Sequence, residues 1–191
     1  MSYCLTVYAV SVEHLQRVLG SRDEKLIQRI AEENDYFFSR IDEIDDEAGL
    51  SCADALTQMI RGEVSDDAPG YLYGYALKAI CAAVGSELPA IYDIVGTGDW
   101  SDEVDQALKQ AGAPVRLTQL MYGGSPVPIP EPDDFPSIGN WSPAQVQAAS
   151  AALKIADLAG DTEMAHTLRQ IQGWSDIACN QPQTSLIGFL S

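Results

Sequence analysis

The adjacent carboxylates Asp133 and Asp134 have the side-chain type that a general acid–base pair requires. They stand between Pro132 and Phe135-Pro136, and prolines hold the neighbouring backbone in an extended form. Because successive side chains of an extended chain point apart, the two carboxylates are not expected to converge on one proton. Their position favours a turn-forming or helix-capping role.

A second group of carboxylates runs from Asp42 to Glu47 and includes Asp45 and Asp46. Such a run could bind a cation, but a calcium loop needs spaced ligands around a central glycine, and this run lacks that spacing. The pattern is typical of a solvated acidic surface, which a basic partner could contact.

Two tyrosines, Tyr71 and Tyr75, are four residues apart and share one face of a predicted helix. Gly74 stands beside them, and a glycine inside a helix costs about 1 kcal/mol relative to alanine. We therefore expect something to approach the helix backbone closely at this notch. The favoured occupant is the proline-rich segment or Tyr122, and the alternative is a bound ligand.

The other residues with reactive side chains form no recognised motif. His14 and His166 fall on predicted helices among polar neighbours and are interpreted as surface residues, although a Ser–His or Cys–His pair formed in space stays open. The glycine pair Gly96 and Gly98 is suggestive of a phosphate-binding loop, but the lysine of that motif is missing. A turn before a helix explains both glycines. The sequence therefore assigns no catalytic or metal-binding residue and no cofactor.

Prolines are concentrated between Pro126 and Pro143, where six of the ten in the chain occur. Their alternation excludes a helix and a central strand, so residues 122–140 are predicted to form a stiff, extended and ordered connector. The apolar residues expected to anchor this connector by burial are Val127, Ile129 and Phe135.

The charge balance excludes several classes of partner. The 191-residue chain has 28 acidic and 11 basic residues, which gives a net charge of −17 and an isoelectric point near 4.2. Such a surface repels phosphate backbones and anionic lipids, so neither nucleic acid nor a membrane is expected as a partner. The charge permits a basic protein partner or simply serves solubility, and the oligomeric state is left open.

Composition also indicates the type of domain and the compartment. Hydrophobic residues make up 46% of the chain, which suits one globular domain over residues 1–191. No apolar run approaches the roughly 20 residues of a membrane span, and the first residues lack the features of a signal peptide. The four cysteines form no CxxC pair and are interpreted as buried hydrophobes in a reducing cytoplasm.

The helices and strands expected from the sequence predict a mainly helical α+β fold with a small antiparallel sheet. Tyr3–Val10 alternates between two apolar faces, and Leu186–Leu190 is expected to pair with it because a lone strand cannot satisfy its backbone. Val115–Tyr122 is predicted to be a short strand or extended segment. Caps and apolar spacing predict helices that start at Ser11, at the capping box Ser21–Glu24, and at Ser51, Tyr71, Ser101, Ser142 and Asp161.

Several segments resemble an uncharacterised bacterial family, a domain of unknown function. They are MSY at Met1–Tyr3, GYLYGYAL at Gly70–Leu77, YGGSPVPIPEPDDFP at Tyr122–Pro136, and the closing Gly188-Phe189. The likeness spans nearly the whole chain and is strongest at the proline motif. The family carries no assigned activity, so the resemblance implies no catalytic residue.

Two hypotheses for the function follow. The first is an acidic protein-binding module similar to the immunity proteins that neutralise basic toxins, since charge complementarity speeds such association. The second is a small-ligand-binding protein or enzyme with its site near the tyrosine-rich helix 71–84 and the 122–135 segment. The residues proposed for the partner or ligand surface are Tyr71, Tyr75, Tyr122, Asp133, Asp134, Asp45 and Asp46.

Overall fold

The computed structural model describes residues 3–44, 49–65, 67–94, 97–158 and 160–191. Eight helices and four strands lie within those residues, which confirms the α+β class. Asp45 and Asp46 lie outside the described residues. The elements, in chain order, are β1 (Tyr3–Ser11), α1 (Val12–Val18), α2 (Glu24–Asp42), α3 (Cys52–Arg61), α4 (Gly70–Val84), β2 (Ser86–Ile94), α5 (Thr97–Gln110), α6 (Leu117–Tyr122), β3 (Ser137–Trp141), α7 (Pro143–Ile155), α8 (Glu163–Cys179) and β4 (Thr184–Leu190).

The strands form one antiparallel sheet in the order β2-β1-β4-β3. The two central strands come from opposite ends of the chain, and their register pairs Leu5 with Leu190 and Ser11 with Thr184. This confirms the predicted pairing of the N-terminal and C-terminal strands. Both strands are almost wholly buried, as the mostly apolar faces of Tyr3–Val10 predicted.

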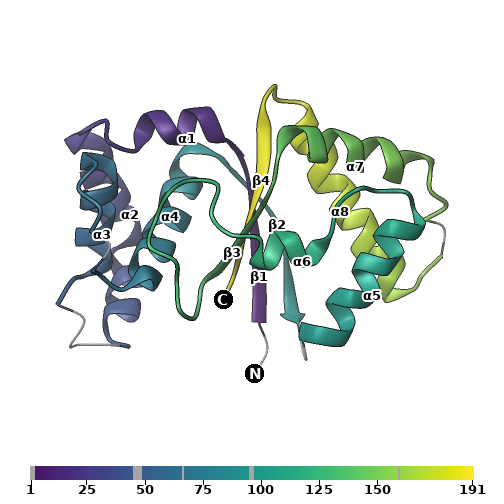
Figure 1. Ribbon diagram of the computed structural model, residues 1–191, viewed down its shortest axis with the longest axis horizontal. Helices are drawn as coiled ribbons and strands as arrows, with labels where there is room; N and C mark the ends of the chain where they lie inside the picture. Colours follow the sequence, from purple (N-terminus) through teal and green to yellow (C-terminus); the bar gives the residue numbers. More distant parts are fainter. Residues whose placement is uncertain (1–2, 45–48, 66, 95–96, 159) are drawn as a thin grey trace.

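Helices cover both faces of the sheet (Figure 1). Alternate residues of β1 enter two separate cores: Tyr8 and Val10 pack with α1–α4, whereas Leu5 and Val7 pack with α5–α8. In Figure 1 the first group of helices lies to the left of the sheet and the second group to the right. The fold therefore has three layers, with the sheet in the middle.

The short helix α6 lies directly on the sheet because two neighbouring strands present glycine at the contact. Gly139 of β3 pairs with Gly188 of β4. A Cβ atom on either residue would collide with the carbonyl group of Leu120 in α6. The absence of both side chains lets the α6 backbone approach the sheet more closely than ordinary helix–sheet packing allows.

The helix α6 replaces the extended segment predicted for Val115–Tyr122, so that prediction was wrong. Its buried residues, Leu117, Leu120 and Met121, follow helical spacing. Its first turn has no side-chain cap of its own. The Asp105 carboxylate, from α5, instead accepts hydrogen bonds from the Leu117 and Thr118 N–H groups. A cap contributed by another helix leaves no local signal in the sequence.

Four helices begin at residues other than those predicted, and α4 differs least, since it begins at Gly70 and not at Tyr71. Asp23, not Ser21, caps α2 by accepting from the Lys25 and Leu26 N–H groups at 3.1 Å. Thr162, not Asp161, caps α8. The helix expected to begin at Ser101 begins at Thr97, and Ser101 is buried within it. By contrast, Ser51 and Ser142 form full capping boxes where they were expected.

Two edge strands were not predicted. β2 contains Pro89, which is tolerated because an edge strand needs only one row of hydrogen bonds. The Pro89 carbonyl accepts from the Trp174 indole N–H at 2.9 Å and from the Gln170 amide at 2.8 Å. β3 includes residues 137–140, which were predicted to belong to the connector over 122–140. The irregular proline-rich segment therefore ends at Pro136.

Cysteine burial differs from the expectation in part. Cys52 and Cys81 are buried, Cys4 is half-buried and Cys179 is exposed. Burial, together with the nearby Asp42 carboxylate, raises the pKa of the Cys52 thiol to about 12. Among the described residues, none of the helices has both the length and the apolar character that a membrane crossing requires.

The glycine contact beneath α6 gives a direct stability test. Gly188→Ala should lower the free energy of unfolding by about 1–3 kcal/mol or more, because the new methyl group meets a rigid carbonyl. Gly173→Ala, inside α8 with no atom within 4 Å of the added Cβ, should instead raise it by about 0.5–1 kcal/mol. Denaturant unfolding of both variants measures these two changes in the free energy of unfolding. Equal changes in the two variants would contradict the close approach of α6 to the sheet.

Candidate functional site

Residues 123–136, here called the proline segment, connect α6 to β3 without a helix or strand of their own. The segment leaves α6, crosses in front of the sheet to the layer of α1–α4, and turns back to enter β3 (Figure 1). It therefore joins the two helical layers over the outside of the sheet. The bond between Phe135 and Pro136 is cis.

The proline segment lies against two glycines of α4, one turn apart. A Cβ on Gly70 would collide with the Glu131 backbone, and a Cβ on Gly74 would lie 2.9 Å from Pro136 and 3.3 Å from Pro132. The notch beside the tyrosines is thus filled by proline rings of the same chain, which was the favoured interpretation. Tyr122 does not occupy it.

Carbonyl oxygens of the proline segment face the start of α4. The Pro130 and Glu131 carbonyls approach Gly70, the first residue of the helix, and the preceding Pro69 offers no side-chain cap. The positive end of the helix dipole favours such oxygens. The segment therefore has an electrostatic reason, as well as a steric one, to lie where it does.

Apolar residues anchor the proline segment to different depths. Val127 is buried in the core formed with α1–α4, and Ile129 packs partly against that core. Phe135 is only half-buried and packs against Tyr3, with ring centroids 5.0 Å apart. The deepest anchor is therefore Val127, and Phe135 contributes less than a fully buried ring would.

The entry to the proline segment is fixed to the edge of the sheet. The Gly124 N–H donates to the Ile138 carbonyl at 2.8 Å, and the Gly124 carbonyl accepts from the Asn140 side chain at 3.0 Å. The Ser125 hydroxyl closes the next turn by bonding both the N–H and the carbonyl of Val127. These bonds cover the outer edge of β3, which would otherwise present unpaired backbone groups.

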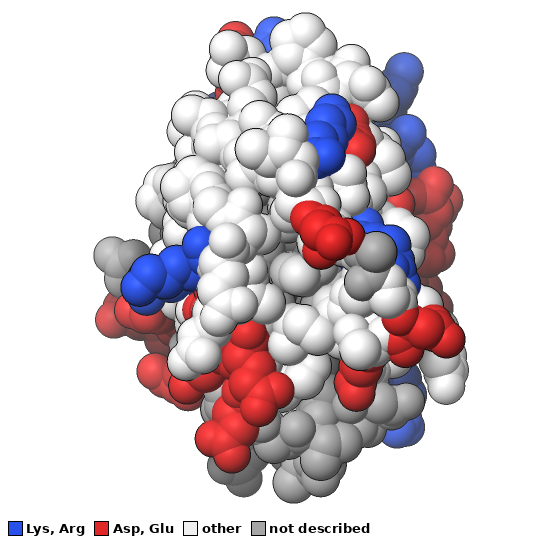
Figure 2. Space-filling model, turned by 90° about the vertical axis from the view of Figure 1, so that its right-hand side faces the viewer, with Lys and Arg blue, Asp and Glu red and all other residues white. Residues whose placement is uncertain are grey.

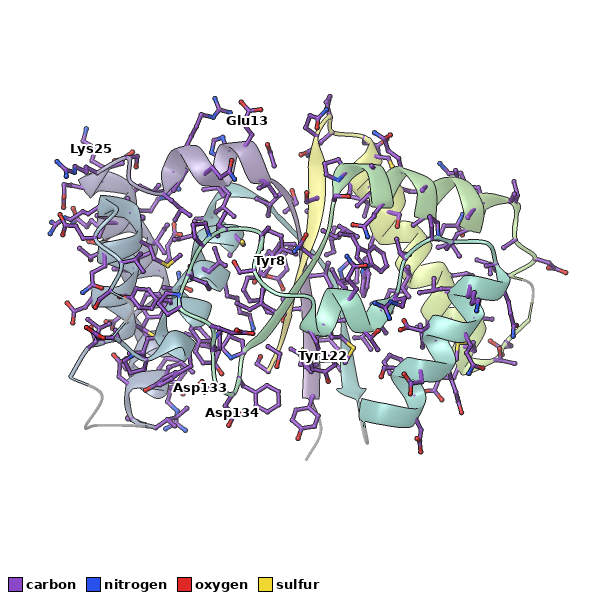
Figure 3. The ribbon with its side chains drawn as sticks, viewed as in Figure 1. Tyr8, Glu13, Lys25, Tyr122, Asp133 and Asp134 are labelled. Carbon is purple, nitrogen blue, oxygen red and sulfur yellow. The ribbon has the colours of Figure 1, made fainter. Side chains whose placement is uncertain are left out.

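The proline segment and the residues that flank it enclose a pocket of about 490 Å³. Its lining includes proline and aliphatic residues, and its residues with polar side chains are Tyr122, Ser125, Ser137 and Glu131. The full lining is Tyr122, Gly124, Ser125, Val127, Pro128, Ile129, Glu131, Pro132, Pro136, Ser137 and Ile138. The Tyr122 side chain is 49% exposed and lies at the α6 end of the segment (Figure 3).

Hydrogen-bond acceptors outnumber donors around this pocket. The eleven lining residues include three prolines, so their eleven backbone carbonyls are accompanied by eight N–H groups. Between Leu117 and Leu153 the sequence has no lysine or arginine, and its charged residues there are Glu131, Asp133 and Asp134. The pocket is therefore suited to a guest that donates hydrogen bonds or carries positive charge.

The proposed residues that the structure describes divide into three groups. Tyr75 is 8% exposed and packs edge-on against Phe37 at 5.6 Å, so it belongs to the core, as does the half-buried Tyr71 packed against it. Asp133 and Asp134 are exposed and lie at the turn of the proline segment far from Tyr122 (Figure 3). Tyr122 alone among these residues lines the pocket.

Tyr75 and Asp134 are close enough to influence each other. Burial, with contributions from Cys52 and Asp134, raises the pKa of the Tyr75 hydroxyl. A tyrosine held neutral in this way acts as a packing residue of the α4 face and not as a base at neutral pH.

A half-buried lysine, Lys78, was not singled out from the sequence. Its ammonium group lies 3.4 Å from the Ser191 hydroxyl and 5.9 Å from the centroid of the Phe37 ring. Burial lowers the pKa of the Lys78 ammonium, and the nearby Cys4 and Glu87 oppose that shift. The contacts with Phe37 and Ser191 hold this cation at the end of the central strands.

The histidines lie on the surface, as expected. His166 Nε2 lies 2.7 Å from the Asp161 carboxylate, and the Arg169 guanidinium donates to Nδ1 at 3.0 Å. Since Nδ1 accepts, Nε2 carries the proton and donates to Asp161. No group of three or more potential metal ligands occurs among the described residues.

A family model described as domain of unknown function DUF7691 matches residues 1–191. The chain belongs to this family. The resemblance to a domain of unknown function is thereby confirmed. No curated protein and no solved structure matches this DUF7691 chain significantly.

The contact between α4 and the proline segment can be tested by filling the notch. Gly70→Ala should lift the segment from α4, because the new Cβ meets main-chain atoms of Glu131, and should lower the free energy of unfolding by about 1–3 kcal/mol. Limited proteolysis should then cleave within residues 126–136 faster than in the parent protein. Unchanged cleavage and unchanged stability would contradict the contact, with Gly173→Ala as the control.

Proposed function

We propose that this chain is an acidic protein-binding module that neutralises a basic protein partner, as immunity proteins neutralise toxins. The observation that carries the proposal is the excess of 17 negative charges, which no pairing within the chain can balance. Arg61–Glu24, Arg40–Glu43 and Lys154–Asp176 are ion pairs of the described surface, and all are substantially exposed. Such pairs contribute little to stability, and the carboxylates that they leave over are available to a basic partner.

The excess charge is spread around the molecule. Figure 2 shows the side on which α5 and α8 lie, where acidic side chains gather in the middle and lower part of the face. Exposed carboxylates on these helices include Asp99, Asp102, Glu103 and Glu163, and on the opposite side α2 carries Glu32, Glu33 and Asp35. A negative electrostatic field of this extent raises the rate at which a basic protein encounters the chain. It does not by itself determine the orientation in which that protein binds.

A local feature must therefore fix the docked orientation. The proline segment supports this role because it combines exposed carboxylates, an exposed tyrosine and a concave apolar surface without any cation of its own. Tyrosine is enriched in the centres of protein interfaces, where one end of the side chain packs and the other forms hydrogen bonds.

A second candidate function is the binding of a small ligand, and the pocket volume of about 490 Å³ favours it. Sites for small molecules typically measure about 300–1,000 Å³ and have mainly apolar walls. The two candidates differ in affinity. A cognate small ligand would bind tightly without any protein partner, whereas one side chain of a protein partner binds weakly when it is presented alone.

Salt dependence tests the proposed function. Proteins captured by the immobilised chain from cells that naturally express it should be basic, and their association rate should fall at least about tenfold between about 20 mM and 500 mM salt. A captured partner expressed alone should be toxic, and co-expression of this chain should relieve that toxicity. A partner whose association rate is independent of salt, or whose activity is unchanged by binding, would contradict the proposal.

A further inference from the structure

We propose that the pocket of the proline segment is a receptor for a single arginine or lysine side chain from the basic partner. This inference rests on the proposed function and specifies where the partner would be recognised. The occupant is defined by its chemistry: an aliphatic stem that ends in a positively charged hydrogen-bond donor.

The walls of the pocket suit the stem. Pro128, Pro132, Pro136 and Ile129 present aliphatic carbon, against which the methylene groups of lysine or arginine can pack. Tyr122, which is 49% exposed, is the aromatic residue of the lining. A guanidinium or ammonium group over such a face gains a cation–π interaction as well.

The polar groups suit the charged end. The lining residues carry more backbone carbonyls than N–H groups, and their one charged side chain is the Glu131 carboxylate, so an anionic guest is disfavoured. Glu131 lines the pocket and is exposed, so its carboxylate oxygens are available to a guest. Charge-assisted hydrogen bonds to these oxygens favour a cationic donor over a neutral one of the same shape.

The pocket is also held in shape without a guest. Val127 is buried in the core, Gly124 is bonded to β3, and Gly70 and Gly74 receive the segment on α4. A receptor that is fixed before binding loses little conformational entropy when the side chain enters. Measurable binding of one side chain is therefore expected even in a short peptide.

The test uses three blocked pentapeptides that differ only in a central residue flanked by glycines: arginine, lysine or citrulline. Citrulline has nearly the shape of arginine but no charge. Backbone amide chemical shifts of the full-length protein, followed during titration with each peptide, give both the location and the affinity. The arginine and lysine peptides should shift amides within residues 122–138, and the citrulline peptide should bind at least about fivefold more weakly.

Two variants and two matched controls distinguish binding in the pocket from attraction by the overall negative charge. Glu131→Gln should weaken arginine-peptide binding about threefold to fivefold, whereas Glu103→Gln, the same charge change at an exposed position of α5, should leave it within about twofold. Tyr122→Ala should weaken binding to a similar extent, and Tyr92→Ala, which removes a 70% exposed tyrosine of β2, should not. All four positions are exposed, so the variants are expected to fold.

Three results would overturn the inference: equal binding of the citrulline and arginine peptides, shifts that map outside residues 122–138, or equal weakening by each variant and its control. If the captured basic partner still binds with strong salt dependence in any of these cases, the proposed function stands and only the pocket assignment fails. If the pocket binds the arginine peptide but no basic partner associates with the chain, the proposed function fails and a small cationic ligand becomes the occupant.

Discussion

Close approach of main chain to main chain is the constraint on which the rest of this structure depends. Gly139 and Gly188 let the α6 backbone lie on one face of the sheet, and Gly70 lets the Glu131 backbone lie on α4 in the opposite layer. The proline segment spans the distance between these two contacts. A side chain at any of the three glycines would separate surfaces that the chain has to join, so the path of the segment and the position of both helical layers are linked.

This constraint also shapes the surface proposed to bind. Prolines limit the conformations of the segment, and the buried Val127 and the bonded Gly124 fix it at two points. The result is a concave surface with surplus carbonyl oxygens and the Glu131 carboxylate, on a protein with a net charge of −17. In the proposed function, the general charge would attract a basic partner, and the local surplus of acceptors would select one of its side chains.

Sequence reasoning succeeded where the signal is local. Alternating apolar residues identified β1 and β4, serine caps identified the starts of α3 and α7, and the glycine beside Tyr71 and Tyr75 indicated a close neighbour. It failed where the cause lies far along the chain. The cap of α6 comes from Asp105, and β2 forms although it contains Pro89 because it pairs on one side only. The sequence placed a candidate ligand site near the 122–135 segment, but the form of the pocket could not be predicted, because the course of its irregular walls is set by glycines in distant elements.

The most direct test of this account is the mobility of the proline segment in solution. Backbone ¹⁵N relaxation of the full-length protein gives an order parameter for Val127, Ile129 and Glu131, the residues of 127–131 that carry an N–H. If the segment is held on α4 and β3, these values should equal those of the central strand β1, at about 0.85. Values below about 0.6 at these three residues would show a flexible linker and would contradict both the fixed pocket and the constraint that shapes it.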